Sequence, residues 1–299
     1  MSRLALGLDV GGSHVTAGLI DLDSRRATRT ARRDVPHSAP LGTLLRAWAQ
    51  AAREAAGDHA AGLTHLGIAL PGPFDGRGGR SHMTHKFPAL LNVPLRAPLR
   101  AALGAPFSPD LPLLFGNDAD LFALGEWWAS PERPERLIGV TLGTGLGSGF
   151  ILRGQPQQAG PGVPPNGELW NTPTPDGILE DCLSGAAVTR LGVLLTGRQS
   201  AAGVTAAQWA EAGRQGNATA LSVWAEFGTR AGQRLAPWTS AFGADVLVLG
   251  GNVSQAFGLF AAHLDLGPCQ VRRSTHFELA PVLGVATLRG RVWADSPGF

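Results

Sequence analysis

Hydrophobic residues follow two spacings along this chain, and their order predicts a mixed α/β protein. Apolar residues at helical spacing predict helices over 41–56 and 118–128 and a closing helix over 281–293. Short apolar runs that stop at glycine or proline predict buried strands between the helices. The strands expected in this way, with their hairpin partners, are 4–10, 14–21, 29–35, 65–70, 113–116, 137–141, 150–153 and 245–249.

One part of this pattern occurs twice. A strand at 4–10 runs through a glycine turn into a second strand, and a strand at 137–141 runs through the glycine-rich stretch 143–149 into another at 150–153. An offset of 132 (141 minus 9) places Asp9 on Thr141 and Gly7 on Gly139. This recurrence predicts two related halves that face each other.

Composition narrows the classes of function. The hydrophobic fraction of 44% supports real cores, and a net charge of +2 without a basic stripe argues against a nucleic-acid partner. Cys182 and Cys269 stand far apart, which excludes a disulfide framework and fits a reducing compartment. No stretch reaches about 18 apolar residues, so we expect a cytoplasmic protein that binds no membrane.

Glycine turns follow three of the predicted strands, at Gly11-Gly12, at 143–149 and at Gly250-Gly251. Without a Cβ, such a turn lets backbone N–H groups converge on an anion, although a single one is more often only a tight hairpin. Three of them favour phosphate binding. A Walker A loop is excluded because Lys86, the only lysine, follows His85, and no glycine fingerprint leads from a strand into a helix.

Asp9 lies where the first strand meets its glycine turn. It is either a turn-forming residue that bonds its own backbone or an acid placed beside phosphates. Beside phosphates it would be repelled unless a cation lay between them, and Mg²⁺ bound by one or two carboxylates and phosphate oxygens meets that need.

Four motifs stand in a distinctive order and spacing. They are Leu8-Asp9-Val10-Gly11-Gly12-Ser13, Leu70-Pro71-Gly72-Pro73, Gly116-Asn117-Asp118-Ala119 and Thr141-Leu142-Gly143-Thr144-Gly145-Leu146-Gly147-Ser148-Gly149. With them the chain resembles, over nearly its whole length, the ROK family of bacterial sugar kinases and repressors in the actin-like ATPase superfamily. The resemblance implies a two-lobed actin-like ATPase (ribonuclease H-like) fold, each lobe a mixed β-sheet with flanking helices. We expect one lobe at 1–116, completed by a C-terminal helix at 283–299, and the other at 117–282.

The resemblance also implies a catalytic residue. A sugar hydroxyl needs an acceptor for its proton, while phosphoryl transfer otherwise rests on positioning and charge neutralisation. From the residues alone, a catalytic role and an N-cap role are equally plausible for Asp118, because Asn117 and Asp118 both suit the N-cap of the helix that follows. The resemblance implies that Asp118 is the base and that Asn117 bonds a neighbouring sugar hydroxyl.

Further site residues are implied only by the resemblance, since Glu168 and Glu180 taken alone would be ordinary surface carboxylates. The expected hexose contacts are Asn117, Glu168, Glu180, Asn171 and Gly72. The expected nucleotide contacts are Asp9 (through Mg²⁺ and water), Gly11, Gly12, Ser13, Gly143, Thr144, Gly145, Gly250 and Gly251.

The chain departs from the family pattern at its zinc site. Members typically bind a structural zinc with three cysteines and a histidine, but here Asn171 stands at the histidine's place and Cys182 stands alone. A zinc site needs about four ligands, so we expect no zinc. His82 and His85 lack a third ligand, and Lys86 or His85 stands where members carry an asparagine that contacts sugar.

The favoured function is ATP-dependent, Mg²⁺-dependent phosphorylation of a hexose, with glucose first, by a homodimer. An N-acetylglucosamine or N-acetylmannosamine kinase and a polyphosphate-dependent glucokinase stay open. A non-catalytic sugar sensor would be expected to lose Asp9 or Asp118. A repressor would carry an N-terminal helix-turn-helix, for which about eight residues before the first loop leave no room.

Overall fold

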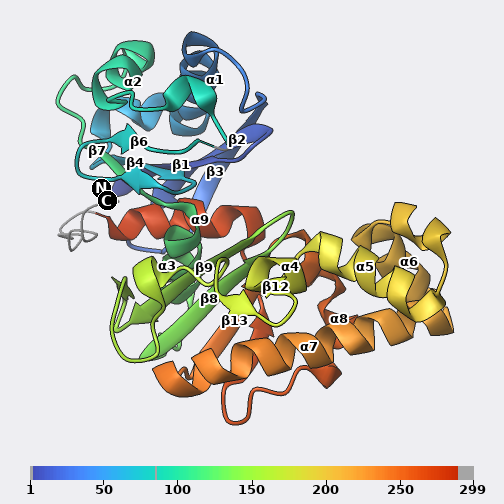
Figure 1. Ribbon diagram of the computed structural model, residues 1–299. Coiled ribbons are helices and arrows are strands. Elements are labelled where there is room, and N and C mark those ends of the chain that lie inside the picture. Colours follow the sequence, from blue (N-terminus) through green and yellow to red (C-terminus); the bar gives the residue numbers. More distant parts are fainter. Residues whose placement is uncertain (1–2, 85, 289–299) are drawn as a thin grey trace. The chain divides into compact units, whose positions relative to one another are not determined.

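The computed structural model describes residues 3–84 and 86–288 (Figure 1). Contacts divide this part of the chain into two compact units. The residues up to Arg133, with those from Glu278 onward, form the first unit, and Pro134–Phe277 forms the second. The sequence suggested boundaries at 116 and 282 instead. The contacts therefore group the helix that begins at Asp118 with the first unit.

The first unit is built on a five-stranded mixed sheet with the strand order β3-β2-β1-β4-β7. Strand β1 is antiparallel to β2 and parallel to β4, which is parallel to β7. Its elements are β1 (Leu4–Val10), β2 (His14–Asp21), β3 (Arg26–Asp34), α1 (Leu41–Ala56), β4 (Leu66–Leu70), β5 (Phe74–Asp75), β6 (Arg80–Ser81), α2 (Arg96–Leu103), β7 (Leu113–Asn117), α3 (Asp118–Ala129) and α9 (Ala280–Gly284).

The second unit is built on another five-stranded mixed sheet, in the order β10-β9-β8-β13-β14. The long helix α7 contributes to the apolar core on one face of this sheet, where Phe242 packs edge-to-face on Phe150 at 5.2 Å. Its elements are β8 (Arg136–Leu142), β9 (Leu146–Leu152), β10 (Gln155–Gln157), β11 (Pro173–Thr174), β12 (Gly177–Ile178), α4 (Leu179–Leu183), α5 (Gly185–Thr196), α6 (Ala206–Arg214), α7 (Ala218–Phe242), β13 (Val246–Gly250), α8 (Phe257–Phe260) and β14 (Gln270–Arg273).

The two sheets share one topology, which confirms the expected mixed sheets. In each, an antiparallel three-stranded meander is extended by two parallel strands. Gly7 pairs with Gly18 in the first sheet, and Gly139 pairs with Gly149 in the second. Gly139 follows Gly7 at the expected offset of 132, whereas Gly149 follows Gly18 at 131 (149 minus 18), because the second turn is one residue shorter.

Strand β3 begins at Arg26 rather than at residue 29, and two other expected elements differ more from the structure. Strand β9 begins at Leu146 rather than at residue 150, so the turn before it is confined to 143–145. The alternating glycines in 145–149 predict a turn, because glycine disfavours strand structure. They are tolerated in β9 because pairing with β8 supplies the backbone hydrogen bonds. The closing helix expected at 281–293 is a short α9 followed by a 3₁₀ turn at Val285–Thr287, and residues 289–299 lie outside the described chain.

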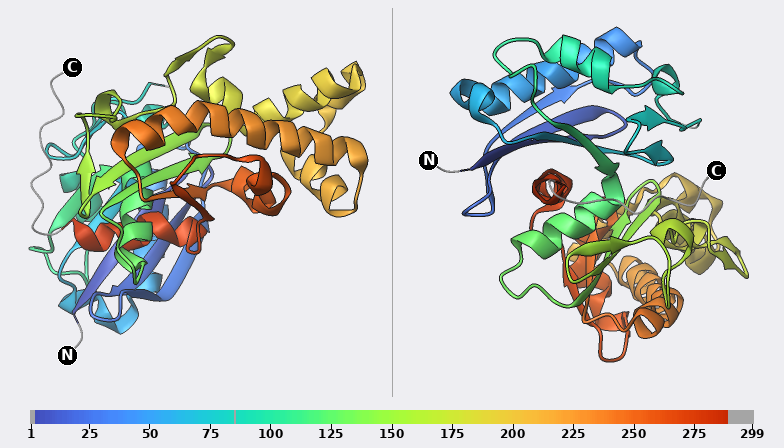
Figure 2. Two further views of the ribbon diagram at one scale, coloured as in Figure 1. Left: turned by 90° about the horizontal axis from the view of Figure 1, so that it is seen from below. Right: turned by 90° about the vertical axis from the view of Figure 1, so that its left-hand side faces the viewer.

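The first sheet is covered on both faces. Helices α1 and α2 cover one face, and α9 lies against the other (Figure 2). Glycines make room for α9, since a Cβ added at Gly7 would lie 2.7 Å from the carbonyl oxygen of Val282, and one at Gly67 would lie 2.3 Å from a Val285 methyl carbon. The backbones of α3 and α9 are also in contact, because a Cβ at Gly125 would lie 1.8 Å from the Ala280 oxygen.

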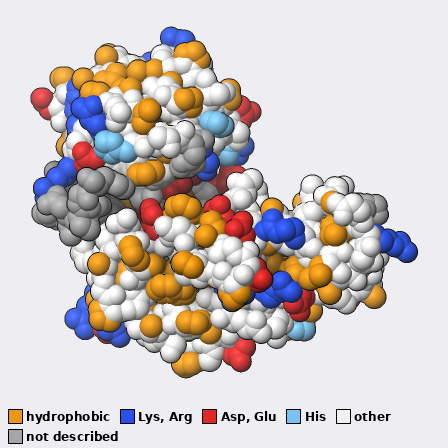
Figure 3. All heavy atoms as spheres, in the orientation of Figure 1, with side chains coloured by type: hydrophobic (Ala, Val, Ile, Leu, Met, Phe, Trp, Pro, Cys, Tyr) orange, Lys and Arg blue, Asp and Glu red, His pale blue; other side chains and the backbone are white. Residues whose placement is uncertain are grey.

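Hydrophobic side chains remain visible among the polar ones on the surface (Figure 3). The most exposed large ones include Leu194 on α5, at 63%, and Leu195 beside it, at 46%. Among the described residues, none of the helices combines the length and the hydrophobicity that crossing a bilayer requires.

Replacing Gly125 with alanine should destabilise the protein although alanine favours helices. The helix propensity gain is about 1 kcal/mol, but the added methyl would force α3 and α9 apart, at a cost of typically about 1–3 kcal/mol or more. We expect urea unfolding of Gly125→Ala to show a net loss of stability. Gly258→Ala in α8 is the control, because nothing lies within 4 Å of its added methyl. Equal stability of the two variants would contradict this packing.

Candidate functional site

The ends of the parallel strands in the first unit bring three expected site residues to one edge. Asp9 is in register with Ala69 of β4, which is in register with Gly116 of β7. Gly72 follows β4, and Asp118 follows β7. Asp9 and Gly116 are thus two strand spacings apart, roughly 10 Å. Asp9 and Asp118 therefore share this edge.

The first glycine turn joins β1 to β2 beside Asp9. Its Gly11 N–H donates to the His14 oxygen at 2.9 Å, and the His37 N–H donates to the Gly12 oxygen at 2.8 Å. Within the described chain, the N–H groups of Gly12 and Ser13 find no protein acceptor. Adjacent unpaired amides of this kind can bind an anion.

Asn117 and Asp118 have different roles at the start of α3. Asn117 is the N-cap, since its Oδ1 accepts the N–H groups of Ala119 at 2.9 Å and Asp120 at 3.2 Å. Asp118 is the first helical residue, and one of its oxygens also accepts the Ala119 N–H, at 2.8 Å. The cap therefore occupies the Asn117 oxygen, and only its amide nitrogen is available as a donor to a ligand.

The surroundings of Asp118 shift the pKa of its carboxyl group. Burial raises its pKa above the ordinary value of 3.8, while the positive charge of Lys86 and the Ala119 N–H lower the pKa and partly offset that effect. A raised pKa makes a carboxylate a better proton acceptor, which is what general-base catalysis requires. Lys86 is exposed and follows His85, which lies outside the described residues.

The carboxyl group of Asp9 is poorly hydrated and surrounded by like charge. Burial, with the charges of Asp118 and Glu278, raises the pKa of Asp9 to about 8. A cation beside it would reverse this shift by stabilising the ionised form. One carboxylate is sufficient when phosphate oxygens and water complete the coordination of Mg²⁺, so this donor set fits the expected ion.

The second glycine turn, between β8 and β9, is the counterpart of the first. Its Gly143 N–H donates to the Gly145 oxygen at 2.9 Å. In the described part of the chain, the N–H groups of Thr144 and Gly145 have no protein acceptor. The carboxylate of Glu180 holds the end of this turn, because its Oε2 accepts the Leu146 N–H at 2.9 Å. Glu180 thus has a structural role beside the role in sugar binding that the resemblance implies.

Helix α5 begins at the same turn. The N–H of its first residue, Gly185, donates to the Gly143 oxygen at 2.8 Å. Its N-cap residue, Ser184, makes no side-chain capping bond. The amides and dipole of a helix N-terminus attract negative charge, so the turn and the helix end together form an anion-binding corner.

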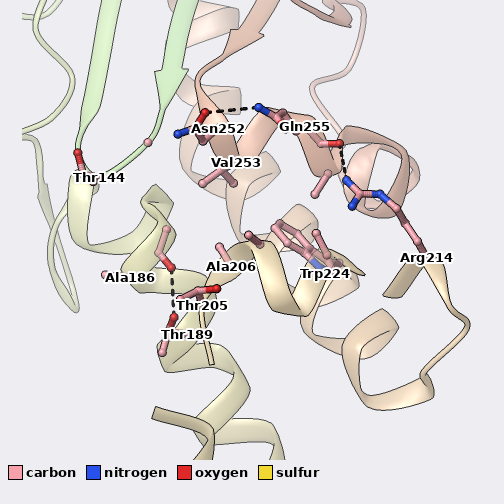
Figure 4. A pocket seen from close by; sticks show the side chains of 15 residues that line it. Thr144, Ala186, Thr189, Thr205, Ala206, Arg214, Trp224, Asn252, Val253 and Gln255 are labelled. Carbon is pink, nitrogen blue, oxygen red and sulfur yellow. Dashed lines mark hydrogen bonds between the residues drawn. The ribbon is translucent and has the colours of Figure 1, made fainter. Parts of the chain in front are cut away.

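A cavity of about 710 Å³ extends from this corner into the second unit. Figure 4 shows Thr144 and Ala186 on one side of its lining and Arg214 on the other. Arg214 donates to the Gln255 oxygen at 3.2 Å, and Gln255 donates to Asn252 at 3.4 Å. Small apolar side chains dominate the rest of the lining, including Ala186, Ala206, Ala207, Ala210, Val253 and Ala256. Such a volume suits a ligand of nucleoside size.

Gly250 and Gly251 do not line this cavity, whereas the residues that follow them do. Gly251 has φ 76°, and a Cβ there would lie 2.4 Å from the Leu142 oxygen, so the glycine allows β13 to pass close to the second turn. Asn252 and Gln255 then line the cavity. The Gly250-Gly251-Asn252 motif pointed to this region, but the residues from α5, α6 and α7 carry no comparable sequence signal.

Glu168 and Asn171 lie on a segment anchored to β9. The buried Ser148 hydroxyl donates to the Gly167 oxygen at 2.7 Å and accepts the Leu169 N–H at 2.9 Å. Glu168 is half-buried, and Asn171 is exposed. The backbone oxygen of Trp170 accepts the Glu180 N–H at 3.0 Å, so the segments that carry the two glutamates lie side by side.

Metal-binding clusters of protein side chains are absent from residues 3–84 and 86–288, in which no group of three or more His, Cys, Asp or Glu could hold an ion. Cys182 lies 3.5 Å from the Thr174 hydroxyl, and His82 contacts the Asn92 side-chain oxygen at 3.2 Å. The expected lack of structural zinc stays a prediction, which metal analysis of the purified protein tests.

Metal-free protein should lose stability between about pH 4 and pH 8 because of Asp9. Its pKa is raised from 3.8 when unfolded to about 8 when folded, so the folded state holds a proton that ionisation removes as the pH rises. In Asp9→Asn this loss is absent. We expect the melting temperature of the variant to exceed that of the wild type most clearly above pH 8, in the presence of a chelator.

The exposed Asp110 supplies the control, and Asp110→Asn should follow the wild type at every pH. A melting temperature of Asp9→Asn that runs parallel to the wild type from pH 4 to pH 9 would contradict the raised pKa.

Comparison with known proteins adds three findings. A glucokinase of Thermotoga maritima is 26% identical over 96% of this chain and 98% of its own length. An N-acetyl-D-glucosamine kinase of Salmonella typhimurium is 34% identical over 50% of this chain and 46% of its own length. The crystal structure of a ROK family glucokinase from Streptomyces griseus, in complex with glucose and AMPPNP, matches 95% of this chain and 98% of its own at a TM-score of 0.76 and 24% identity.

The structural match agrees with the topology of the two sheets and confirms the expected actin-like ATPase fold. The family model described as the ROK family matches residues 5–276. Because that match spans nearly the whole chain, the protein belongs to the ROK family.

Proposed function

We propose that this protein is a sugar kinase that transfers a phosphoryl group from ATP to a hydroxyl of a hexose, with glucose the first candidate. The observation that carries the proposal is the pair of acids at one sheet edge. Asp118, with a raised pKa, serves as the proton acceptor, and Asp9 stands beside unpaired amides. The full-length relative named glucokinase supports the choice of glucose.

Asp118 acts as general base in the proposed reaction. The first turn of α3 and the Asn117 cap hold its carboxylate in place, while Lys86 favours the ionised form. As the sugar hydroxyl attacks the terminal phosphorus of ATP, its proton passes to this carboxylate, the bond from that phosphorus to the bridging oxygen breaks, and ADP leaves. Activity should therefore fall at low pH, with an acid limb above the ordinary aspartate pKa of 3.8.

Asp9 is the residue that would bind Mg²⁺. Its carboxylate would bind Mg²⁺ directly or through water, and the unpaired amides of Gly12 and Ser13 would contact phosphate oxygens. When bound, Mg²⁺ neutralises charge that develops on the transferring phosphoryl group. The carboxylate itself then stays ionised, because the cation offsets the negative charges of Asp118 and Glu278.

The second unit supplies the donor site. The amides of Thr144 and Gly145 and the N-terminus of α5 would bind phosphates, and the cavity beyond them would take the nucleoside. Asn252, Gln255 and Arg214 offer its polar contacts. A donor with a nucleoside explains this cavity better than polyphosphate does, since polyphosphate would leave the apolar lining empty.

An N-acetylglucosamine kinase is the second candidate for the acceptor. The half-length match to relatives of that name favours it, at 35% identity over 152 residues. An N-acetylmannosamine kinase, a homodimer and a cytoplasmic location remain predictions, and so do the lobes at 1–116 and 117–282. Retention of both Asp9 and Asp118 argues against a non-catalytic sugar sensor.

Release of ADP across a panel of acceptors tests the function. We expect glucose to be phosphorylated best among glucose, mannose, fructose, allose, N-acetylglucosamine and N-acetylmannosamine. Asp118→Asn should fold normally but lose at least about 10²-fold in turnover, because no base then takes the proton. Asp110→Asn is the control and should retain wild-type turnover. Near-wild-type turnover of Asp118→Asn would remove Asp118 as the base.

Filling the cavity tests the donor site separately. Ala207 lies on α6 and lines the cavity, so Ala207→Trp should raise the KM for ATP at least about tenfold, a loss of about 1.4 kcal/mol. The binding of sugar alone, measured by calorimetry, should not change. Ala218→Trp at the start of α7 is the control, because Ala218 is exposed and does not line the cavity. An unchanged KM for ATP in Ala207→Trp would place the nucleoside elsewhere.

A further inference from the structure

Trp170 is exposed although it is one of the largest apolar side chains of the protein. Its exposed fraction is 41%, whereas Trp48 and Trp224 are fully buried. Its indole Nε1 donates a hydrogen bond to Oε2 of Glu168 at 3.2 Å. An exposed aromatic ring is therefore hydrogen-bonded to the carboxylate for which the resemblance implies a contact with the sugar.

The backbone around this pair is held on several sides. Leu169, between the two residues, is fully buried, and its N–H bonds the buried Ser148 hydroxyl. The Leu169 oxygen accepts the Thr172 N–H at 3.0 Å, and the Trp170 oxygen accepts the Glu180 N–H at 3.0 Å. These bonds and the buried Leu169 hold the backbone that carries the Trp170 side chain, although much of that side chain faces solvent.

The indole N–H constrains what Glu168 can do. A carboxylate on a flexible side chain loses rotamer entropy when it binds a ligand. Bonding one oxygen to the indole N–H in advance reduces that loss and leaves Oε1 to accept sugar hydroxyls with charge-assisted strength. The indole ring also presents an apolar surface beside these polar contacts. Tryptophan can combine the two because its ring is apolar while its N–H donates a hydrogen bond.

We propose that Trp170 is a positioning and specificity residue for the acceptor sugar, because it orients the Glu168 carboxylate and covers an apolar face of the sugar ring. This inference rests on the proposed function. It assigns Trp170 to the binding of sugar, with no part in the binding of ATP or in proton transfer. The matching acceptor is a neutral pyranose with hydroxyls that reach a carboxylate and a C–H face that meets an aromatic ring.

The test compares Trp170→Phe, which keeps a ring but loses the N–H, with Trp170→Ala, which loses both. We expect the KM for glucose to rise about 3- to 10-fold in Trp170→Phe, as for loss of one partly exposed hydrogen bond to a charged group, and further in Trp170→Ala. The kcat and the KM for ATP should stay within about twofold of the wild type. Trp238→Phe, a half-buried tryptophan on α7, is the matched control and should leave all three constants unchanged.

A double-mutant cycle with Glu168→Gln separates positioning from simple structural damage. A neutral amide accepts the indole N–H only weakly, so adding Trp170→Phe to Glu168→Gln should change the KM for glucose by less than about twofold. Should Trp170→Phe fail to fold, Trp170→His carries the test, because it keeps an N–H donor and should show a smaller rise in KM than Trp170→Ala.

Four distinct outcomes overturn the inference. An unchanged KM for glucose in Trp170→Phe, or the same rise in KM with and without Glu168, removes the role of Trp170 while the kinase stands. A parallel rise in the KM for ATP indicates general damage instead. A wild-type protein that phosphorylates no sugar at saturating ATP refutes the proposed function itself, and the inference falls with it.

Discussion

The shared direction of β1, β4 and β7 is the constraint on which the first half of the site depends. Parallel strands end at one edge of a sheet, where the backbone turns away and leaves amides without ladder partners. Asp9 and Asp118 lie at that edge, and burial raises the pKa of both carboxyl groups. Two ionised carboxylates in such poorly hydrated surroundings are unfavourable unless a cation or a bound proton neutralises their charge. The proposed metal and the proposed proton transfer supply that compensation.

The repeated topology shows how one architecture serves two tasks. In the first unit the turn after β1 is preceded by an acid, whereas the equivalent place in the second unit is Thr141, which carries no charge. The second unit instead places the N-terminus of α5 at its turn, where the helix dipole favours phosphate directly. Glu180 supports this turn through a backbone amide, so a carboxylate expected to touch sugar also shapes the anion-binding corner.

Much of the fold could be predicted from the sequence because buried strands and glycine turns are local signals. Strands β1 and β2 and helix α1 have the expected bounds, since apolar runs stop at Gly11 and the helical spacing ends before Gly57. Strand β9 was harder, because its glycines resemble a turn until pairing with β8 supplies their hydrogen bonds. Gly143 and Thr144, which were expected nucleotide contacts, line the cavity. Most of the lining was not foreseen, because Thr189, Thr205 and Arg214 lie on α5, at the N-cap of α6 and on α6, where the local sequence does not indicate a shared cavity.

By itself, the sequence determined the family, the order of the strands along the chain and the motifs that mark the candidate site, because each depends on residues close together in the chain. Only the tertiary structure decided which of those residues meet. It brings Asp9 and Asp118 to one edge, makes Asn117 rather than Asp118 the helix cap, and ties Trp170 to Glu168. These outcomes depend on strand register, burial and side-chain direction, and residues far apart in the chain set all three.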